Sequence, residues 1–338
     1  MAKQVYLDLI QSDQAQHSKD ANIISSSKGS YADVMHRILI HKKWTELPLH
    51  MIAGMTATVF RLVVDRRLTE ESISAYNWMA ENFVAADFIG VTVSQAAGFS
   101  FAPTFPLYQK QALVDIKTSI DRGVGVIVWH DQFVIAAGYD DVEQVLLLCN
   151  SEGQDVTRLP YDSFGRNSTP YWYYQVLESC RAVDLWEVCK ESLIQAIYKW
   201  ETHDYMLSSQ NYACGSAAYS VMASALETSV YDPRQAAAVL RYYCRSREIM
   251  ASYVAGLGYL SDQMAQVIQE YRSLSDLYME MIRWVDHCDL WDVKEPECVQ
   301  SVIALLHQAR ETEQRAIDAI KQAFSETIGN RFIDVGLR

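Results

Sequence analysis

The sequence predicts an α+β protein, with an antiparallel sheet in its first half and an all-α second half. Residues 124–153, "VGVIVWHDQFVIAAGYDDVEQVLLLCNSEG", carry short apolar runs separated by polar turn residues, which is typical of neighbouring strands. From about Ala182 the apolar residues recur with a helical period. This change of period predicts two domains, residues 1–180 and 181–338.

The first 86 residues favour a short strand followed by helices. "QVYLDLI" alternates as a strand or docking arm, and a polar loop leads to a helix over 31–46 and an extended "LPLHMI". The apolar residues from Gly54 to about Asp65 predict a buried helix. Another helix is expected after Thr69, because the acidic Glu70 and Glu71 suit the positive end of a helix dipole.

Residues 87–108 contain glycines, two prolines and several aromatics, which predicts irregular structure. Within them "FSFAPTFPLY" is the expected lid or pocket wall, because irregular aromatic loops often carry function. "QKQALVDIKTSIDRG" predicts an amphipathic helix that ends in glycine. Three strands follow, with a turn at Gly138–Asp141, and "TPYWYYQVLES" predicts a further strand after a loop.

The second half contains five helix candidates with clear apolar faces. In the last of them Val299, Val302, Ile303 and Leu306 share one face, which packs either internally or against a second copy in a homodimer. The candidates are residues 184–201, 213–227, 232–254, 260–287 and 296–324.

Charge and cysteine content narrow the class of protein. The 338 residues carry a formal net charge of −13, which repels phosphate backbones and argues against nucleic acid as a partner. The seven cysteines form no C-x-x-C pair, so neither a disulfide framework nor a zinc site is expected. With no signal-like N-terminus and no run of 18 apolar residues, the chain is expected to be cytoplasmic, without a membrane span.

The order of elements is that of papain-like cysteine enzymes, and two motifs carry a closer resemblance. "AGMTATVFRLV" resembles the nucleophile helix of bacteriocin-processing peptidases, and "DRGVGVIVWHDQFVIAAGYDDVEQVLLLCNSEG" resembles their strand block. With a helical half following, the chain resembles the family of butirosin biosynthesis protein H. The resemblance implies a papain-like domain and an enzyme that transfers an acyl group from a carrier protein to an amine.

The same resemblance assigns site residues and shows that two of three roles are missing. The nucleophile position falls on Ala53, the histidine position on Gln132, and the orienting position near Asn150. His130 lies two residues before Gln132, on the same face if the strand is regular, and is the alternative base. The backbone N–H groups of Gly54 and Met55 would stabilise an oxyanion, and Trp129 is an expected substrate contact.

Other features have competing interpretations. "ACGSAAYSVM" repeats the small-residue helix start with Cys214 as a thiol, and His203 and Asp204 are its candidate partners; alternatively, Cys214 only packs where helices cross. Ala53 and Gly54 serve either a site or close helix packing. Asp140 and Asp141 are turn residues or, with His130, a metal site, which is the less favoured interpretation.

Two hypotheses of function follow. The first is an enzyme of specialised metabolism that acts on a carrier-bound acyl thioester by acyl transfer, amide formation or cyclisation without the usual cysteine. The second is a catalytically inactive papain-like binding or partner protein. Neither requires a cofactor, and the expected partner is an acyl carrier protein or a small-molecule substrate.

Overall fold

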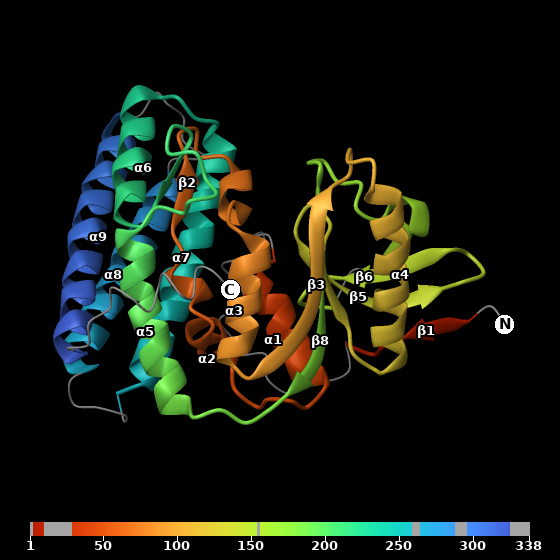
Figure 1. The fold of residues 1–338 in the computed structure, drawn as a ribbon. Coiled ribbons are helices and arrows are strands. Elements are labelled where there is room, and N and C mark those ends of the chain that lie inside the picture. The colour runs from red at the N-terminus through yellow and green to blue at the C-terminus, as the bar shows by residue number, and fades with distance from the viewer. Residues whose placement is uncertain (1–2, 10–28, 154–155, 259–263, 288–295, 325–338) are drawn as a thin grey trace. The chain divides into compact units, whose positions relative to one another are not determined.

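The computed structural model describes residues 3–9, 29–153, 156–258, 264–287 and 296–324 (Figure 1). The chain forms two compact units. We call Met1–Ile52 with Glu81–Val183 the sheet unit, and Ala53–Ala80 with Asp184–Arg338 the helical unit. The expected boundary near 180 lies close to the last crossing between the units, whereas residues 53–80 belong with the second half of the chain.

The sheet unit is built on one antiparallel sheet of seven strands, and this confirms the α+β class. The strand order is β3-β8-β4-β5-β6-β7, and β1 pairs with the far end of β5. The strands are β1 (Gln4–Tyr6), β3 (Val91–Phe99), β4 (Val126–Trp129), β5 (Phe133–Asp140), β6 (Val145–Cys149), β7 (Thr157–Pro160) and β8 (Tyr171–Cys180).

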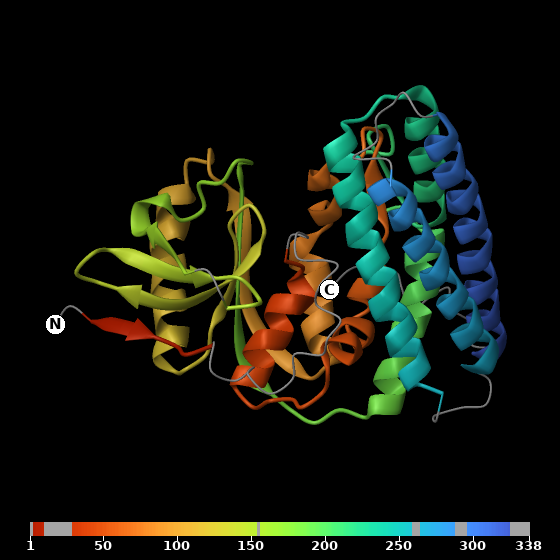
Figure 2. The ribbon, with the colours of Figure 1, turned by 180° about the vertical axis from the view of Figure 1, so that it is seen from behind.

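Helices α1 (Tyr31–His41) and α4 (Phe105–Asp121) cover opposite faces of this sheet, as Figures 1 and 2 show. Helix α1 begins with a capping box, in which Ser30 and Asp33 satisfy each other's backbone N–H groups. The face under α4 is filled by a dry apolar cluster that includes Ile116 and Trp172. Both faces of the sheet are therefore buried in the middle of the unit.

The irregular structure predicted for residues 87–108 is wrong, because the segment contains β3 and the start of α4. Gly98 lies inside the strand rather than breaking it: a Cβ there would come within 2.9 Å of the Trp172 indole. The β5–β6 turn covers residues 141–144. It comes later than predicted because Gly138 pairs with Tyr6 of β1.

The helical unit confirms the five helices predicted for the second half. In α9 the side chains of Val302, Ile303 and Leu306 are buried, which agrees with internal packing of that face. A two-stranded ribbon, β2 (Val63–Asp65) with β9 (Tyr212–Cys214), joins the inserted segment to this unit. The helices are α5 (Leu185–Glu201), α6 (Ser216–Thr228), α7 (Pro233–Gly256), α8 (Met264–His287) and α9 (Pro296–Ala323).

A buried ion pair lies in the interior of the helical unit. Arg247 of α7 is fully buried, and its Nη2 donates to both carboxylate oxygens of Glu313 of α9, at 3.0 and 2.9 Å. The hydroxyl of Tyr219 donates to the same carboxylate at 2.6 Å, and Tyr278 donates to Tyr219. Two tyrosines, Tyr219 and Tyr278, therefore support one buried charge pair in the core of the helical unit.

Two further findings concern the chain as a whole. None of the helices within the described ranges is both long and apolar enough to cross a membrane. Cys298 is disulfide-bonded, which departs from the expectation of a chain without disulfides, whereas Cys149, Cys180, Cys189, Cys214 and Cys244 are free.

Candidate functional site

Position 53 does not lie at a helix N-terminus. The helix expected to start at Gly54 is wrong: α2 (Leu49–Met55) ends there, and a 3-10 turn over Thr58–Phe60 and strand β2 follow. In the last turn of a helix the N–H groups of Gly54 and Met55 donate to carbonyl groups of the preceding turn. They are therefore not available to stabilise an oxyanion. Ala53 is buried, and its carbonyl accepts bonds from Thr56 and Thr58.

Gly54 is needed for close packing. A Cβ on Gly54 would lie 2.1 Å from the ring of Tyr253, closer than any real contact. The Tyr253 hydroxyl is fixed at 2.6 Å from Ser192 Oγ, which in turn donates to the carbonyl of Cys189. The small residues of "IAGM" thus make room for a buried tyrosine, as the packing alternative predicts.

The other expected site residues gather at one end of the sheet. Strand β4 ends at Trp129 and β5 starts at Phe133, so His130 and Gln132 lie in the hairpin turn between them. Asn150 directly follows β6, the antiparallel neighbour of β5, and so it lies at the same sheet end. His130 and Gln132 do not share the face of a regular strand, because Asp131 between them has a φ of 57°.

Gln132 has a definite structural contact. Its side-chain Oε1 accepts a bond of 3.2 Å from the N–H of Gly29, just before α1. An amide at this position, where the resemblance expects a histidine, therefore holds the start of α1 to the sheet. His130 is half-buried, and Asp131 links the hairpin to Ser168 by two bonds of 2.9 and 2.6 Å.

Ser30 is the residue that the sequence analysis missed. It caps α1, the helix that packs on β4 and β5, and it follows Gly29, which Gln132 holds. Its hydroxyl donates to the Asp33 carboxylate at 2.6 Å. This helix start faces the sheet, whereas position 53 lies at a helix end. The available signal was the sequence Ser-x-x-Asp directly before the apolar run of α1.

A neutral polar network lies under the start of α1. Tyr31 donates to Gln175 Oε1 at 2.7 Å, Gln175 donates to Gln95 at 3.0 Å, and Tyr173 donates to the same Gln95 oxygen at 2.8 Å. The ring of Phe133 packs edge-on against the rings of Tyr31, Tyr173 and Trp129. Trp129 thus belongs to the core of the sheet unit and is almost entirely buried.

Most of the free thiols are buried, and one of them adjoins a helix start. Burial raises the pKa of the Cys149 thiol, next to Asn150, to about 11. Cys214 ends β9, paired with Val63, and directly precedes the N-cap of α6, so it lies at a helix start as expected, but its side chain is buried. Its neighbour Gly215 is the position that requires a small residue, since a Cβ there would lie 2.4 Å from the carbonyl of Trp200. His203 and Asp204 bond within their own loop.

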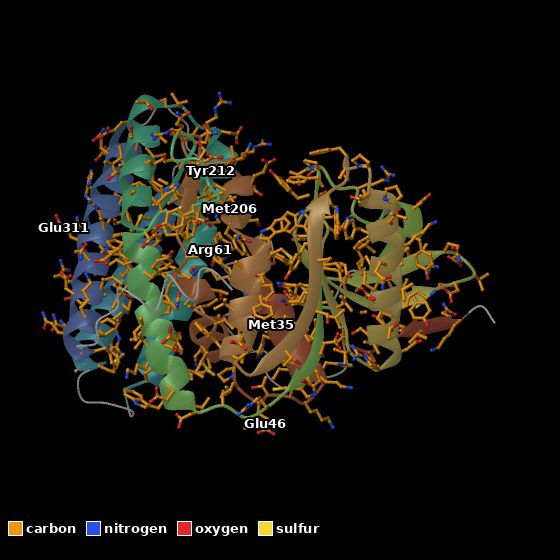
Figure 3. The ribbon with its side chains drawn as sticks, viewed as in Figure 1. Met35, Glu46, Arg61, Met206, Tyr212 and Glu311 are labelled. Atoms are coloured by element: carbon orange, nitrogen blue, oxygen red, sulfur yellow. The ribbon has the colours of Figure 1, made fainter. Side chains whose placement is uncertain are left out.

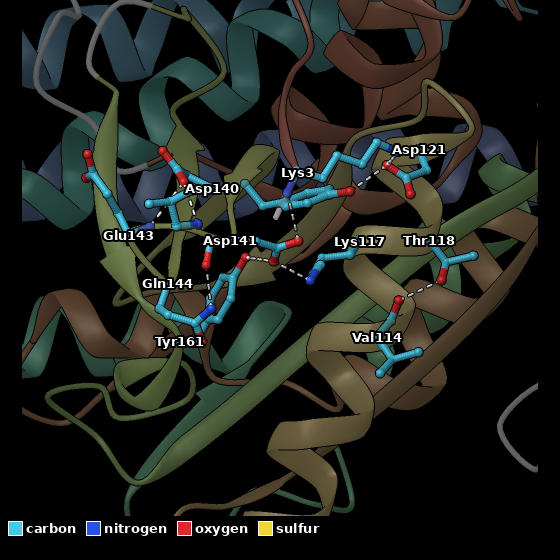
Figure 4. Close-up of polar contacts among 12 residues, drawn as sticks. Lys3, Val114, Lys117, Thr118, Asp121, Asp140, Asp141, Glu143, Gln144 and Tyr161 are labelled. Carbon is cyan, nitrogen blue, oxygen red and sulfur yellow. Dashed lines mark hydrogen bonds and ion pairs between the residues drawn. The ribbon is translucent and has the colours of Figure 1, made fainter. Parts of the chain in front are cut away.

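The opposite end of β5, at the turn to β6, holds a polar cluster that is shown in Figure 4. Asp140 Oδ1 accepts from the N–H groups of Val142 and Glu143 and so forms the turn. Asp141 accepts from Lys117 at 2.5 Å and from the Tyr161 hydroxyl at 3.0 Å, and its pKa is held below the usual range mainly by Lys117.

The metal interpretation of Asp140, Asp141 and His130 is wrong. His130 lies before the start of β5 at Phe133, and Asp140 is the last residue of this eight-residue strand, so about 23 Å of strand separates His130 from the two aspartates. Within the described parts of the chain, no three His, Cys, Asp or Glu residues are grouped as metal ligands.

A groove of about 430 Å³ lies between α8 and α9 of the helical unit. Its walls carry Asp276, Glu280 and Glu311 together with Arg315, which is already paired with Glu270. Figure 3 labels Glu311 on the outer side of α9. The groove is open and acidic, and nothing in it resembles the chemistry of acyl transfer.

Comparison with known proteins adds no family. No protein-family model matches the chain, and no curated protein matches it significantly.

Proposed function

We propose that this chain is a non-catalytic binding protein with a papain-like sheet unit, similar to the butirosin biosynthesis protein H family, that binds an acyl thioester or a related small molecule. The observation that carries the proposal is the bond from Gly29 N–H to Gln132 Oε1. A side-chain amide whose oxygen already accepts a bond from the backbone cannot act as a base that removes a proton from a nucleophile. This contact supports a structural role at the histidine position.

Two further observations support the loss of chemistry. The buried Ala53 has no nucleophilic group, and the N–H groups after it are used inside α2. The Ser30 hydroxyl accepts from the Asp33 N–H as a helix cap and donates to the Asp33 carboxylate. The competing hypothesis, an acyltransferase or cyclase that works by positioning with His130 as base, is favoured only by the partial exposure of His130 on the hairpin.

The test uses S-octanoyl-N-acetylcysteamine as a soluble acyl thioester. We expect calorimetry to show saturable binding and a thiol reagent to show no release of N-acetylcysteamine above the rate without protein. His130→Ala and Ser30→Ala should leave that rate unchanged, with the exposed His307→Ala as the matched control. Release that is lost in His130→Ala or Ser30→Ala, but kept in His307→Ala, would establish the enzyme instead.

A further inference from the structure

Three aromatic side chains form an exposed platform at the end of the sheet that carries His130 and Gln132. Phe99 ends β3, Phe101 follows it, and Tyr171 begins β8; they are 45%, 73% and 47% exposed. The rings of Phe99 and Phe101 stack with centroids 5.1 Å apart, and Phe99 lies 5.4 Å from Tyr171. We call these three residues the aromatic platform.

The platform belongs to the same sheet end and face as the start of α1. Tyr171 pairs with Phe99, and Tyr173, two residues further along β8, pairs with Ala97. Side chains two residues apart share a face, so Tyr171 and Phe99 lie on the face where Tyr173 meets Phe133. Since β4 ends and β5 begins at this sheet end, the platform and Gln132 border the same region.

The loops that carry the platform are fixed rather than loose. Ser100 N–H donates to the carbonyl of Pro170 at 2.8 Å, and Asn167 Nδ2 donates to the carbonyl of Tyr171 at 2.6 Å. Gly165, with a φ of 78°, leaves room for Phe105 and Trp172 behind them. Exposed rings held in place in this way lose little entropy when a ligand binds.

We propose that the aromatic platform binds the apolar chain of a small ligand. This proposal rests on the proposed function and specifies its ligand. Three rings are too few for a stable protein interface, which needs about 20–30 residues a side. A net charge of −13 disfavours anionic membrane surfaces. No charged residue occurs from Phe99 to Gln109, which suits an uncharged chain.

The test compares two thioesters that differ only in the chain, S-octanoyl- and S-acetyl-N-acetylcysteamine, by calorimetry. The unchanged protein should bind the octanoyl compound at least about tenfold more tightly, and Phe101→Ala should abolish that preference. Tyr205→Ala, which removes a ring of 89% exposure in the helical unit, should change the binding of neither compound.

The outcomes separate the two proposals. Equal binding of the two compounds, or a chain preference that survives in Phe101→Ala, would overturn the platform and leave the proposed function standing. Turnover with a raised KM in Phe101→Ala would overturn the non-catalytic function and support the platform. No binding at all would overturn both. A dimer that dissociates on Phe101→Ala, with no chain preference, would show that a second copy covers the rings.

Discussion

Each unit buries one connected polar network, and the two networks differ in charge. The network of the sheet unit is neutral, a chain of tyrosine hydroxyls and glutamine amides from Tyr31 to Tyr173, although Asp33 and Arg37 are also buried in this unit. The network of the helical unit is charged, with Arg247 and Glu313 paired at full burial and surrounded by tyrosines. Breaking a neutral network costs the desolvation of one amide, whereas breaking a buried ion pair leaves an isolated charge.

The comparison predicts that the helical unit is far more sensitive to a single substitution. Replacing an amide of the neutral network removes one hydrogen-bonding partner, whereas replacing one member of the ion pair removes a counter-charge. Four variants test this contrast, and each is followed by the free energy of unfolding in urea unless another measurement is named.

The largest effect is expected for Glu313→Gln. It leaves the fully buried Arg247 guanidinium without a counter-charge, which should destabilise the chain by about 3–5 kcal/mol. The double variant Arg247→Met with Glu313→Leu removes both charges and should recover most of that loss. A single variant as stable as the double one would show that the pair contributes little beyond packing.

The next effect is expected for Gly54→Ala. The added methyl group would meet the Tyr253 ring at 2.1 Å, so the ring or α2 must shift at a cost of about 1–3 kcal/mol. Gly258→Ala is the matched control, because its new Cβ would meet the flexible end of Ile268 at 3.1 Å and the carbonyl of Ala255 at an ordinary contact distance of 3.4 Å. Equal stability of the two variants would contradict the packing role of "IAGM".

A smaller loss is expected for Gln175→Leu in the sheet unit. It removes the acceptor of Tyr31 and the donor to Gln95, at a cost of about 1–2 kcal/mol. Gln144→Leu, on the exposed β5–β6 turn, is the control: it removes only the exposed bond from its side chain to the carbonyl of Asp141 and should cost less than about 1 kcal/mol. A loss as large as that of Glu313→Gln would remove the contrast between the two units.

The smallest effect concerns pH. Burial lowers the pKa of His36 below its usual 6.5, despite the bond from its ring to the carbonyl of Leu47. The unfolded chain therefore binds a proton at His36 more readily than the folded chain does. The contribution of His36 to the free energy of unfolding is fully present above about pH 7 and is lost as the pH drops through 6.5 toward the folded pKa. His36→Gln should flatten this slope in thermal melting between pH 5 and 8; an unchanged slope would assign it to other groups.

How much was visible in the sequence depended on the range of the interactions. The five late helices and the strands from 126 to 149 follow from local periodicity, and they are confirmed. The helix expected from Gly54 to Asp65 failed because β2 pairs with β9, far along the chain, and this pairing overrides the local apolar pattern. Likewise Gly98 suggested a break, although its role is to make room for Trp172 from another strand.

The candidate site was predicted only where it depends on one hairpin. The sequence block around residues 126–150 correctly brings His130, Gln132 and Asn150 to one sheet end, because the strands that carry them are neighbours. Position 53 was expected at a helix start but lies at a helix end, because "AGMTATVF" combines small and apolar residues for a packing reason. The helix from residue 31 was expected, but the place of its start against the sheet was missed, because it depends on contacts more than 90 residues away, such as that from Gly29 to Gln132.

The pairing of β2 with β9 also bears on how the protein is synthesised. Val63 emerges from the ribosome early, but its partner Cys214 is made some 150 residues later, after the whole sheet unit. During that interval the segment 53–80 has no helical unit to join, and its apolar residues are exposed to solvent or to chaperones. A chain cut near residue 180 would keep this orphaned segment permanently, so the fragment would be prone to aggregation even where its sheet is intact.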